Sequence, residues 1–161
     1  MSIDQQKKKK FMREAIRLSM ENVQSGNGGP FGTVIVKNGK IIATGVNEVT
    51  KSNDPTAHAE MIAIRNACEK LNSFQLDGCD IYCSCEPCPM CLGAIYWARP
   101  KSIYFANSKK DAAEINFDDN FIYQEIKLPI HERKLTITQL LRDEAQSVFL
   151  QWQESENKIE Y

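Results

Sequence analysis

Two short motifs that must meet in space constrain this fold more than any other feature of the chain. Residues 87–91 read PCPMC, so prolines flank Cys88, which stands three residues before Cys91. Proline is tolerated in the first turn of a helix, where its missing N–H has no partner to lose. The two thiols therefore lie on one face of a helix N-terminus, one turn apart. His58, one of two histidines in the chain, supplies a third side chain able to bind a metal.

These three side chains match the ligand set of a catalytic zinc, which uses three protein ligands and keeps a fourth position for water. The positive end of each helix favours thiolate over thiol. Glu60 follows His58 by two residues and is close enough to carry protons without binding the metal. We therefore expect one Zn²⁺ per subunit, with His58, Cys88 and Cys91 as ligands and Glu60 as the catalytic acid and base.

A closed structural zinc site is the alternative for the same region. Such a site would use four cysteines, with Cys83 or Cys85 joining Cys88 and Cys91 among them. Four thiolates would complete the coordination of the metal and exclude water. This arrangement would leave the histidine and the glutamate of the H-A-E motif without a role.

The periodicity of apolar residues predicts alternating helices and strands. A helix is expected first, followed by two strands that meet at Asn38-Gly39, a typical hairpin turn. Thr56 is a suitable cap for the next helix. The expected helices are 4–25, 57–71 and 88–98, and the expected strands are 31–36, 41–46, 79–84 and 102–106. This order predicts a mixed sheet with helices on both faces.

The pattern weakens after residue 106, where short helices are expected over 109–115 and 118–127. A longer terminal helix is expected over 136–153, where apolar residues recur at helical spacing. We find no internal repeat and no linker, and 161 residues suit one domain, 1–161.

Composition and charge exclude several functional classes. The chain is 42% hydrophobic and 25% charged, and no apolar run is long enough to span a bilayer, so no membrane partner is expected. The net charge is −1, and the part from Ser108 onward holds 7 basic and 11 acidic residues, which argues against nucleic-acid binding. Six cysteines clustered around a metal motif are typical of a reducing compartment, so we expect a cytoplasmic protein.

Together, H-A-E and P-C-x-x-C are typical of zinc-dependent nucleobase deaminases. The chain resembles the cytidine deaminase-like superfamily and, within it, the small bacterial guanine deaminases. The resemblance is carried by residues 28–32 (GGPFG), 52–60 (SNDPTAHAE), 84–100, 117–119 (FDD) and the terminal 160–161 (EY). It implies a three-layer α/β/α sandwich around a mixed five-stranded sheet.

The resemblance also implies an activity, the zinc-dependent hydrolysis of guanine at C2 to xanthine and ammonia, with Glu60 moving the protons. It implies that Asn47 and the backbone N–H of Ala59 bind the purine and that Phe31 flanks its ring. Asp119 would accept hydrogen bonds from the guanine N–H edge. This role is chemically reasonable, because a carboxylate can accept from two adjacent donors, an edge that adenine lacks.

In the similar proteins a C-terminal segment is exchanged between two subunits, and its last tyrosine reaches a substrate site. The resemblance therefore implies a homodimer that exchanges residues of about 130–161, with Tyr161 as a substrate contact.

Three other functions remain open from the sequence. Deamination of guanosine, another purine or an aminotriazine would use the same zinc motifs. A tRNA adenosine deaminase shares them too, but such enzymes usually carry a basic C-terminal helix, and this chain ends in an acidic third. A non-catalytic zinc scaffold that binds a partner through the acidic tail would leave Glu60 unexplained.

Overall fold

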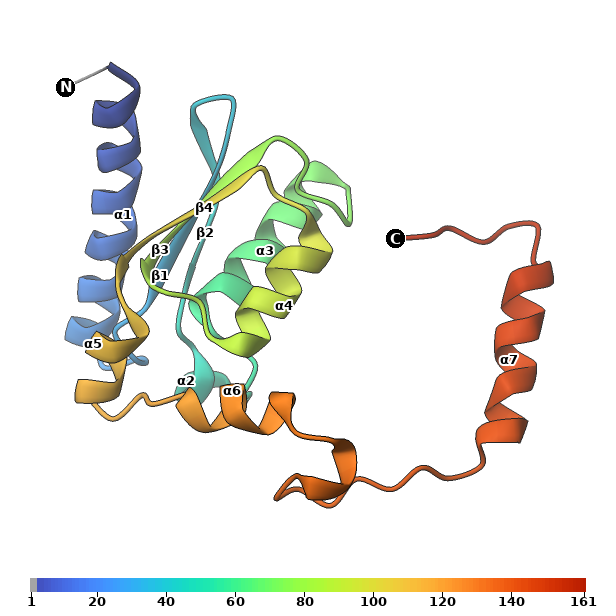
Figure 1. Ribbon diagram of the computed structural model, residues 1–161. Coiled ribbons are helices and arrows are strands. Elements are labelled where there is room, and N and C mark those ends of the chain that lie inside the picture. Colours follow the sequence, from blue (N-terminus) through green and yellow to red (C-terminus); the bar gives the residue numbers. More distant parts are fainter. Residues whose placement is uncertain (1–2) are drawn as a thin grey trace. The chain divides into compact units, whose positions relative to one another are not determined.

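The computed structural model describes residues 3–161 (Figure 1), which divide into two compact units, a first that ends at Asp119 and a second, Asn120–Tyr161. Nine elements make up the first unit. They are α1 (Ile3–Ser25), β1 (Gly32–Lys37), β2 (Lys40–Val46), α2 (Val49–Ser52), α3 (Ala59–Leu71), β3 (Cys79–Cys85), α4 (Pro89–Ala98), β4 (Ser102–Asn107) and α5 (Lys109–Glu114).

The predicted mixed sheet is confirmed in the first unit. Its order is β2-β1-β3-β4, with β1 antiparallel to both neighbours and β3 parallel to β4. The expected count of five strands is wrong, because the sheet formed by residues 3–161 has four. Ser108, directly after β4, starts a helix instead, since its side chain and that of Asp111 cap each other's backbone N–H groups.

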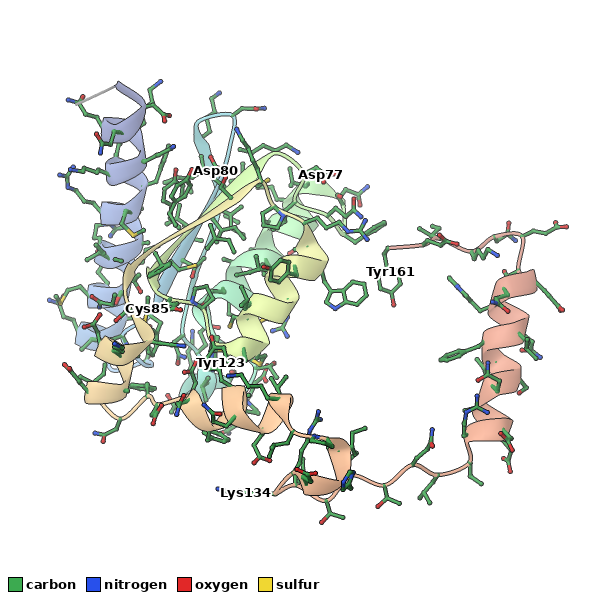
Figure 2. All side chains as sticks on the ribbon, in the orientation of Figure 1. Asp77, Asp80, Cys85, Tyr123, Lys134 and Tyr161 are labelled. Carbon is green, nitrogen blue, oxygen red and sulfur yellow. The ribbon has the colours of Figure 1, made fainter. Side chains whose placement is uncertain are left out.

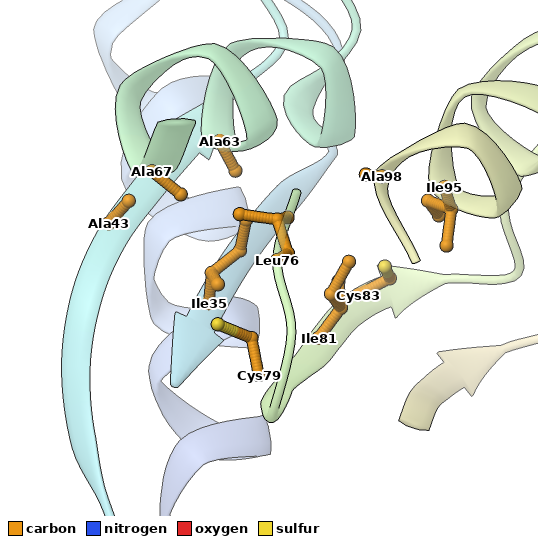
Figure 3. Close-up of a cluster of buried hydrophobic side chains, with 10 residues drawn as sticks. All are labelled: Ile35, Ala43, Ala63, Ala67, Leu76, Cys79, Ile81, Cys83, Ile95 and Ala98. Atoms are coloured by element: carbon orange, nitrogen blue, oxygen red, sulfur yellow. The ribbon is translucent and has the colours of Figure 1, made fainter. Parts of the chain in front are cut away.

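Helices cover both faces of this sheet, as Figure 1 shows, with α1 on one side and α3 and α4 on the other. Alternate residues of a strand point to opposite faces, so Val34 and Val36 pack with Ala15 of α1 while Ile35 points to the opposite side. Figure 3 shows this second cluster, where Ile35 lies with residues of α3, α4 and β3. The site described below lies at the N-terminal ends of α3 and α4, and this packing fixes both helices.

A close approach of backbones fixes where α3 begins. A Cβ added to Gly45 of β2 would lie 2.2 Å from the carbonyl oxygen of Ala59 and 2.6 Å from the backbone nitrogen of Ala63. Only glycine leaves enough room for this contact. The first turn of α3 therefore rests directly on the sheet.

The element boundaries differ from the sequence-based expectations mainly at two helix starts. The helix expected from residue 57 with Thr56 as its cap begins at Ala59, and His58 is the N-cap residue. The Thr56 hydroxyl instead donates to Oδ1 of Asp54 at 2.7 Å. The terminal helix expected from residue 136 begins at Arg142, because threonines precede it and acidic residues that favour a helix N-terminus follow only at 143–144.

The second unit consists of α6 (Asn120–Lys127), the 3₁₀ helix η1 (Ile130–Glu132) and α7 (Arg142–Glu154). All of its residues are described, and none of them is buried. Polar contacts hold its first part, where the Arg133 guanidinium donates to the carbonyl oxygens of Leu128 and Ile126. Within residues 3–161, no helix is long and apolar enough to cross a membrane.

Candidate active site

The starts of two helices meet, as the sequence predicts. His58 is the N-cap residue of α3 and Cys88 the N-cap residue of α4, and Pro89 occupies the first turn of α4. The Nδ1 atom of His58 lies 3.5 Å from Sγ of Cys88 and 3.5 Å from Sγ of Cys91. The three potential ligand atoms lie within 4.8 Å of one another.

The chemistry of this donor set fits zinc. One imidazole nitrogen and two sulfur atoms make three ligands, which leaves a fourth position for water or substrate. The pKa of Cys88 is lowered to about 4, mainly because the Cys91 thiol donates a hydrogen bond to it, and the same interaction raises the pKa of Cys91. A divalent cation at this position would favour the deprotonated form of both thiols.

Glu60 lies in the first turn of α3 and is only 8% exposed. Burial raises the pKa of its carboxyl group, and the negative charge of Cys88 raises it further. A carboxyl group with a raised pKa exchanges protons more readily near neutral pH. Its position beside the three donor atoms suits a proton carrier and not a fourth ligand.

The two cysteines of the alternative site lie outside the cluster. Cys83 is 1% exposed within the core, where burial raises its pKa well above the usual range. Cys85 lies at the end of β3 beside α5 (Figure 2), with Sγ 3.7 Å from the carbonyl oxygen of Ser108. Among residues 3–161, the cluster consists of one histidine and two cysteines, so the four-cysteine site does not form.

Asn47 follows β2 and is 6% exposed. Its Oδ1 atom accepts hydrogen bonds from the backbone nitrogens of Gly29 and Val49, both at 3.3 Å. This arrangement fixes the amide orientation and leaves the amino group for another acceptor. The next residue connects this stretch to the segment before α3, since the nitrogen of Glu48 donates to the carbonyl oxygen of Ala57 at 2.9 Å.

Phe31 and Ala59 are also in the first unit. The backbone carbonyl of Phe31 accepts from the nitrogen of Asn47 at 3.2 Å, and its ring packs edge-on against Phe117 with centroids 5.0 Å apart. The N–H of Ala59 lies in the first turn of α3, where a helix offers no acceptor of its own. Hydrogen bonds of Asn47 hold the segment of Phe31, and the bond from Glu48 to Ala57 joins the same stretch to the residues just before α3.

Asp119 is half-buried and is the last residue of the first unit. Burial raises its pKa, and the charge of Cys88 contributes next, which places this carboxyl group within electrostatic range of the donor cluster. Tyr161 belongs to the second unit, where its side chain is 70% exposed, and its role as a substrate contact stays a prediction.

Sequence reasoning missed Asn22, a buried amide on α1. Its Nδ2 atom donates to the carbonyl oxygens of Gly29 and Asn47, both at 2.9 Å. The only available signal was a polar residue between apolar Met20 and Val23, which alone does not indicate a role.

Comparison with known proteins is consistent with this geometry. Residues 5–107 match the family described as the cytidine and deoxycytidylate deaminase zinc-binding region. The chain is 57% identical over 151 residues to a guanine deaminase from Bacillus subtilis, covering 94% of this chain and 97% of that protein. A tRNA-specific adenosine deaminase from Aquifex aeolicus is 41% identical over 99 residues, which cover 62% of this chain and 65% of the relative.

Solved structures agree. The X-ray structure of guanine deaminase from Bacillus subtilis superimposes with a TM-score of 0.93 at 54% identity, covering 100% of this chain and 99% of that chain. A guanine deaminase from Nitrosomonas europaea gives a TM-score of 0.65 at 30% identity, covering 90% of this chain and 84% of that chain.

Proposed function

Because this chain belongs to the guanine deaminases of the cytidine and deoxycytidylate deaminase family, we propose that it hydrolyses guanine to xanthine and ammonia. The observation that carries the proposal is the cluster of His58, Cys88 and Cys91 with the buried carboxyl group of Glu60 beside it. Zn²⁺ bound by these three ligands supplies a Lewis acid and lowers the pKa of a water molecule toward neutrality.

Glu60 moves the protons of the reaction. Its carboxylate takes a proton from the water that attacks C2 of guanine and passes it to the adjacent ring nitrogen. The same carboxylate then takes the second proton from the hydroxyl group now on C2 and gives it to the 2-amino group, so that C2=O forms, the C2–N bond breaks and ammonia departs. One water is consumed for each guanine, and Glu60 returns to its initial state. Its raised pKa suits both halves of this cycle.

Four residues outside the set of zinc ligands recognise the purine. The amino group of Asn47 and the N–H of Ala59 donate to purine acceptors, and Phe31 flanks the ring. Asp119 accepts from the two N–H donors on one edge of guanine. A purine without that edge would leave the half-buried carboxylate poorly paired.

A substrate panel read by ammonia release tests the proposal. The zinc-loaded protein should release ammonia from guanine and not from adenine, cytosine or cytidine. Guanosine, an aminotriazine and a tRNA anticodon stem complete the panel, because related zinc deaminases share the same ligand motifs. No release from guanine would refute the assignment. Faster release from another compound of the panel would make that compound the substrate.

We also propose a homodimer in which residues of about 130–161 are exchanged, so that Tyr161 of each subunit contacts substrate in the partner. The support is the apolar surface of α7, where Val148 is 61% exposed, Phe149 67% and Trp152 48%. An exposed apolar surface of this kind is typical of an association site, and exchange of an identical element is a simple route to a dimer.

Mixed dimers test the exchange. One chain carries Glu60→Gln and the other Tyr161→Ala, and each is prepared alone and after co-refolding at equal amounts. With exchange, every heterodimer holds one intact site, so activity recovers to about one quarter of wild type under random pairing. Without exchange, each site keeps its own defect and the mixture shows no gain over its separate components.

We further propose that residues 1–161 act as one deaminase domain in the cytoplasm. All six cysteines are free thiols, and thiols that bind zinc persist best in a reducing compartment.

A further inference from the structure

Asn22 lies near the end of α1 and is 5% exposed. The two hydrogen bonds from its Nδ2 atom end on backbone carbonyls from two different segments, the loop after α1 and the chain after β2. Both hydrogens of this amino group are therefore used. A buried amide that joins three segments at one point constrains them more than any single helix contact.

Both backbone polar groups of Gly29 are hydrogen-bonded to asparagine side chains. Its carbonyl oxygen accepts from Asn22 at 2.9 Å, and its nitrogen donates to Oδ1 of Asn47 at 3.3 Å. The neighbouring Gly28 leaves no space for a side chain, since a Cβ there would lie 2.0 Å from the carbonyl oxygen of Asn47 and 3.0 Å from Nδ2 of Asn22. The loop is thus closely packed against both asparagines.

These contacts set the position of two groups that are proposed to bind the purine. Asn22 holds the carbonyl of Asn47, while the nitrogen of Asn47 donates to the carbonyl of Phe31 at 3.2 Å. Gly29, which Asn22 also holds, accepts from the nitrogen of Phe31 at 2.8 Å. A shift at Asn22 would therefore move both the amide of Asn47 and the ring of Phe31.

We propose that Asn22 is a positioning residue for purine binding, which fixes Asn47 and Phe31 without touching the substrate. This inference rests on the proposed function. It places the determinant of substrate affinity partly in α1, on the face of the sheet opposite to α3 and α4. The zinc ligands are held by α3 and α4, so their geometry should not depend on Asn22.

The test is the nearly isosteric variant Asn22→Asp in the full-length, zinc-loaded protein. A carboxyl group can donate at most one hydrogen bond, and only when protonated, so at least one carbonyl loses its donor. We expect KM for guanine to rise about tenfold or more while kcat and zinc content change less than about threefold. A merely structural defect would lower kcat through loss of folded protein and leave KM unchanged.

Asn66→Asp is the matched control. Asn66 is exposed on α3, and its Nδ2 atom also donates to a backbone carbonyl, that of Thr44 at 3.0 Å. This substitution should leave KM at the wild-type value. If Asn22→Asp does not fold, Asn22→Ser serves instead, because its smaller hydroxyl side chain can donate at most one hydrogen bond, so at least one carbonyl again loses its donor and KM should again rise.

A double-mutant cycle separates action through Asn47 from an independent effect. In the background of Asn47→Ala, the Asn22 substitution should raise KM by a smaller factor than in the wild type, because one of the two groups that Asn22 positions has been removed and only the effect through Phe31 remains. Independent, multiplicative effects would overturn the inference, as would an unchanged KM in Asn22→Asp. Wild type measured in parallel must convert guanine, so failure of the proposed function is recognised separately.

Discussion

The two units of the chain differ in how they treat apolar side chains. The first unit buries them in two clusters, one on each face of its sheet, and holds His58, Cys88 and Cys91 at defined distances. The second unit has no buried residue, and its longest helix exposes apolar side chains. Reactive groups must be held by packed neighbours, and the first unit provides this by itself. The second unit lacks a core and can gain order only from another surface.

The largest expected effect concerns the first unit alone. Glu60→Gln should lower kcat by about a thousandfold or more and leave the zinc content at one per chain, because the amide cannot carry protons. Ammonia release and metal analysis measure the two quantities. Glu69→Gln, on the exposed end of the same helix, should behave as wild type. An active Glu60→Gln enzyme would assign proton transfer to another residue, and the first unit would then not hold all the reactive groups by itself.

Asp119, the residue at the boundary, gives the next effect. Its pKa is raised mainly by burial, so it becomes neutral at a higher pH than an ordinary aspartate and then loses charge-assisted acceptance. KM for guanine should therefore rise as the pH is lowered, and the rise should begin at a higher pH than an ordinary aspartate would give. Asp119→Asn should raise KM about 10- to 100-fold and remove this component of the pH dependence. An unchanged KM would exclude Asp119 from the site.

The apolar surface of α7 gives a smaller, concentration-dependent effect. Phe149→Glu introduces a charge at a 67% exposed aromatic residue and should shift the proposed dimer toward monomer in sedimentation experiments. Gln151→Glu adds the same charge at an exposed polar position of the helix and should leave the mass unchanged. If the wild type and both variants had equal masses at every concentration, α7 would not contribute to a dimer contact.

The cluster of His58, Cys88 and Cys91 could be predicted from the sequence because its signals are local. Pro89 indicates the first turn of a helix, and the spacing of Cys88 and Cys91 places both thiols on one face. The H-A-E motif marks a second helix start. The sequence does not show by itself that the two helix starts lie close together in space. The order of helices and strands likewise predicts a mixed sheet with helices on both faces.

Features that depend on long-range contacts could not be predicted in this way. Thr56 is a good cap by composition, but it binds Asp54, and α3 begins after His58. Asn22 has no local signal, because its partners become neighbours only when the loop after α1 meets the end of β2. The contact proposed for Tyr161 depends on a second subunit, which the pattern of one chain does not encode. Family resemblance alone drew attention to that residue.

The smallest expected effect tests whether the first unit is stabilised by its own packing. Gly45→Ala places a Cβ 2.2 Å from the carbonyl oxygen of Ala59, so the start of α3 must move, at a cost of about 1–3 kcal/mol in unfolding free energy. Gly93→Ala is the matched control, since a Cβ there meets nothing within 4 Å and a helix interior gains about 0.5–1 kcal/mol from alanine. Urea unfolding measures both. The loss at Gly45 should be the same at every protein concentration, because its contact lies within one chain. A loss that depends on concentration would mean that the first unit also needs its partner to stay folded.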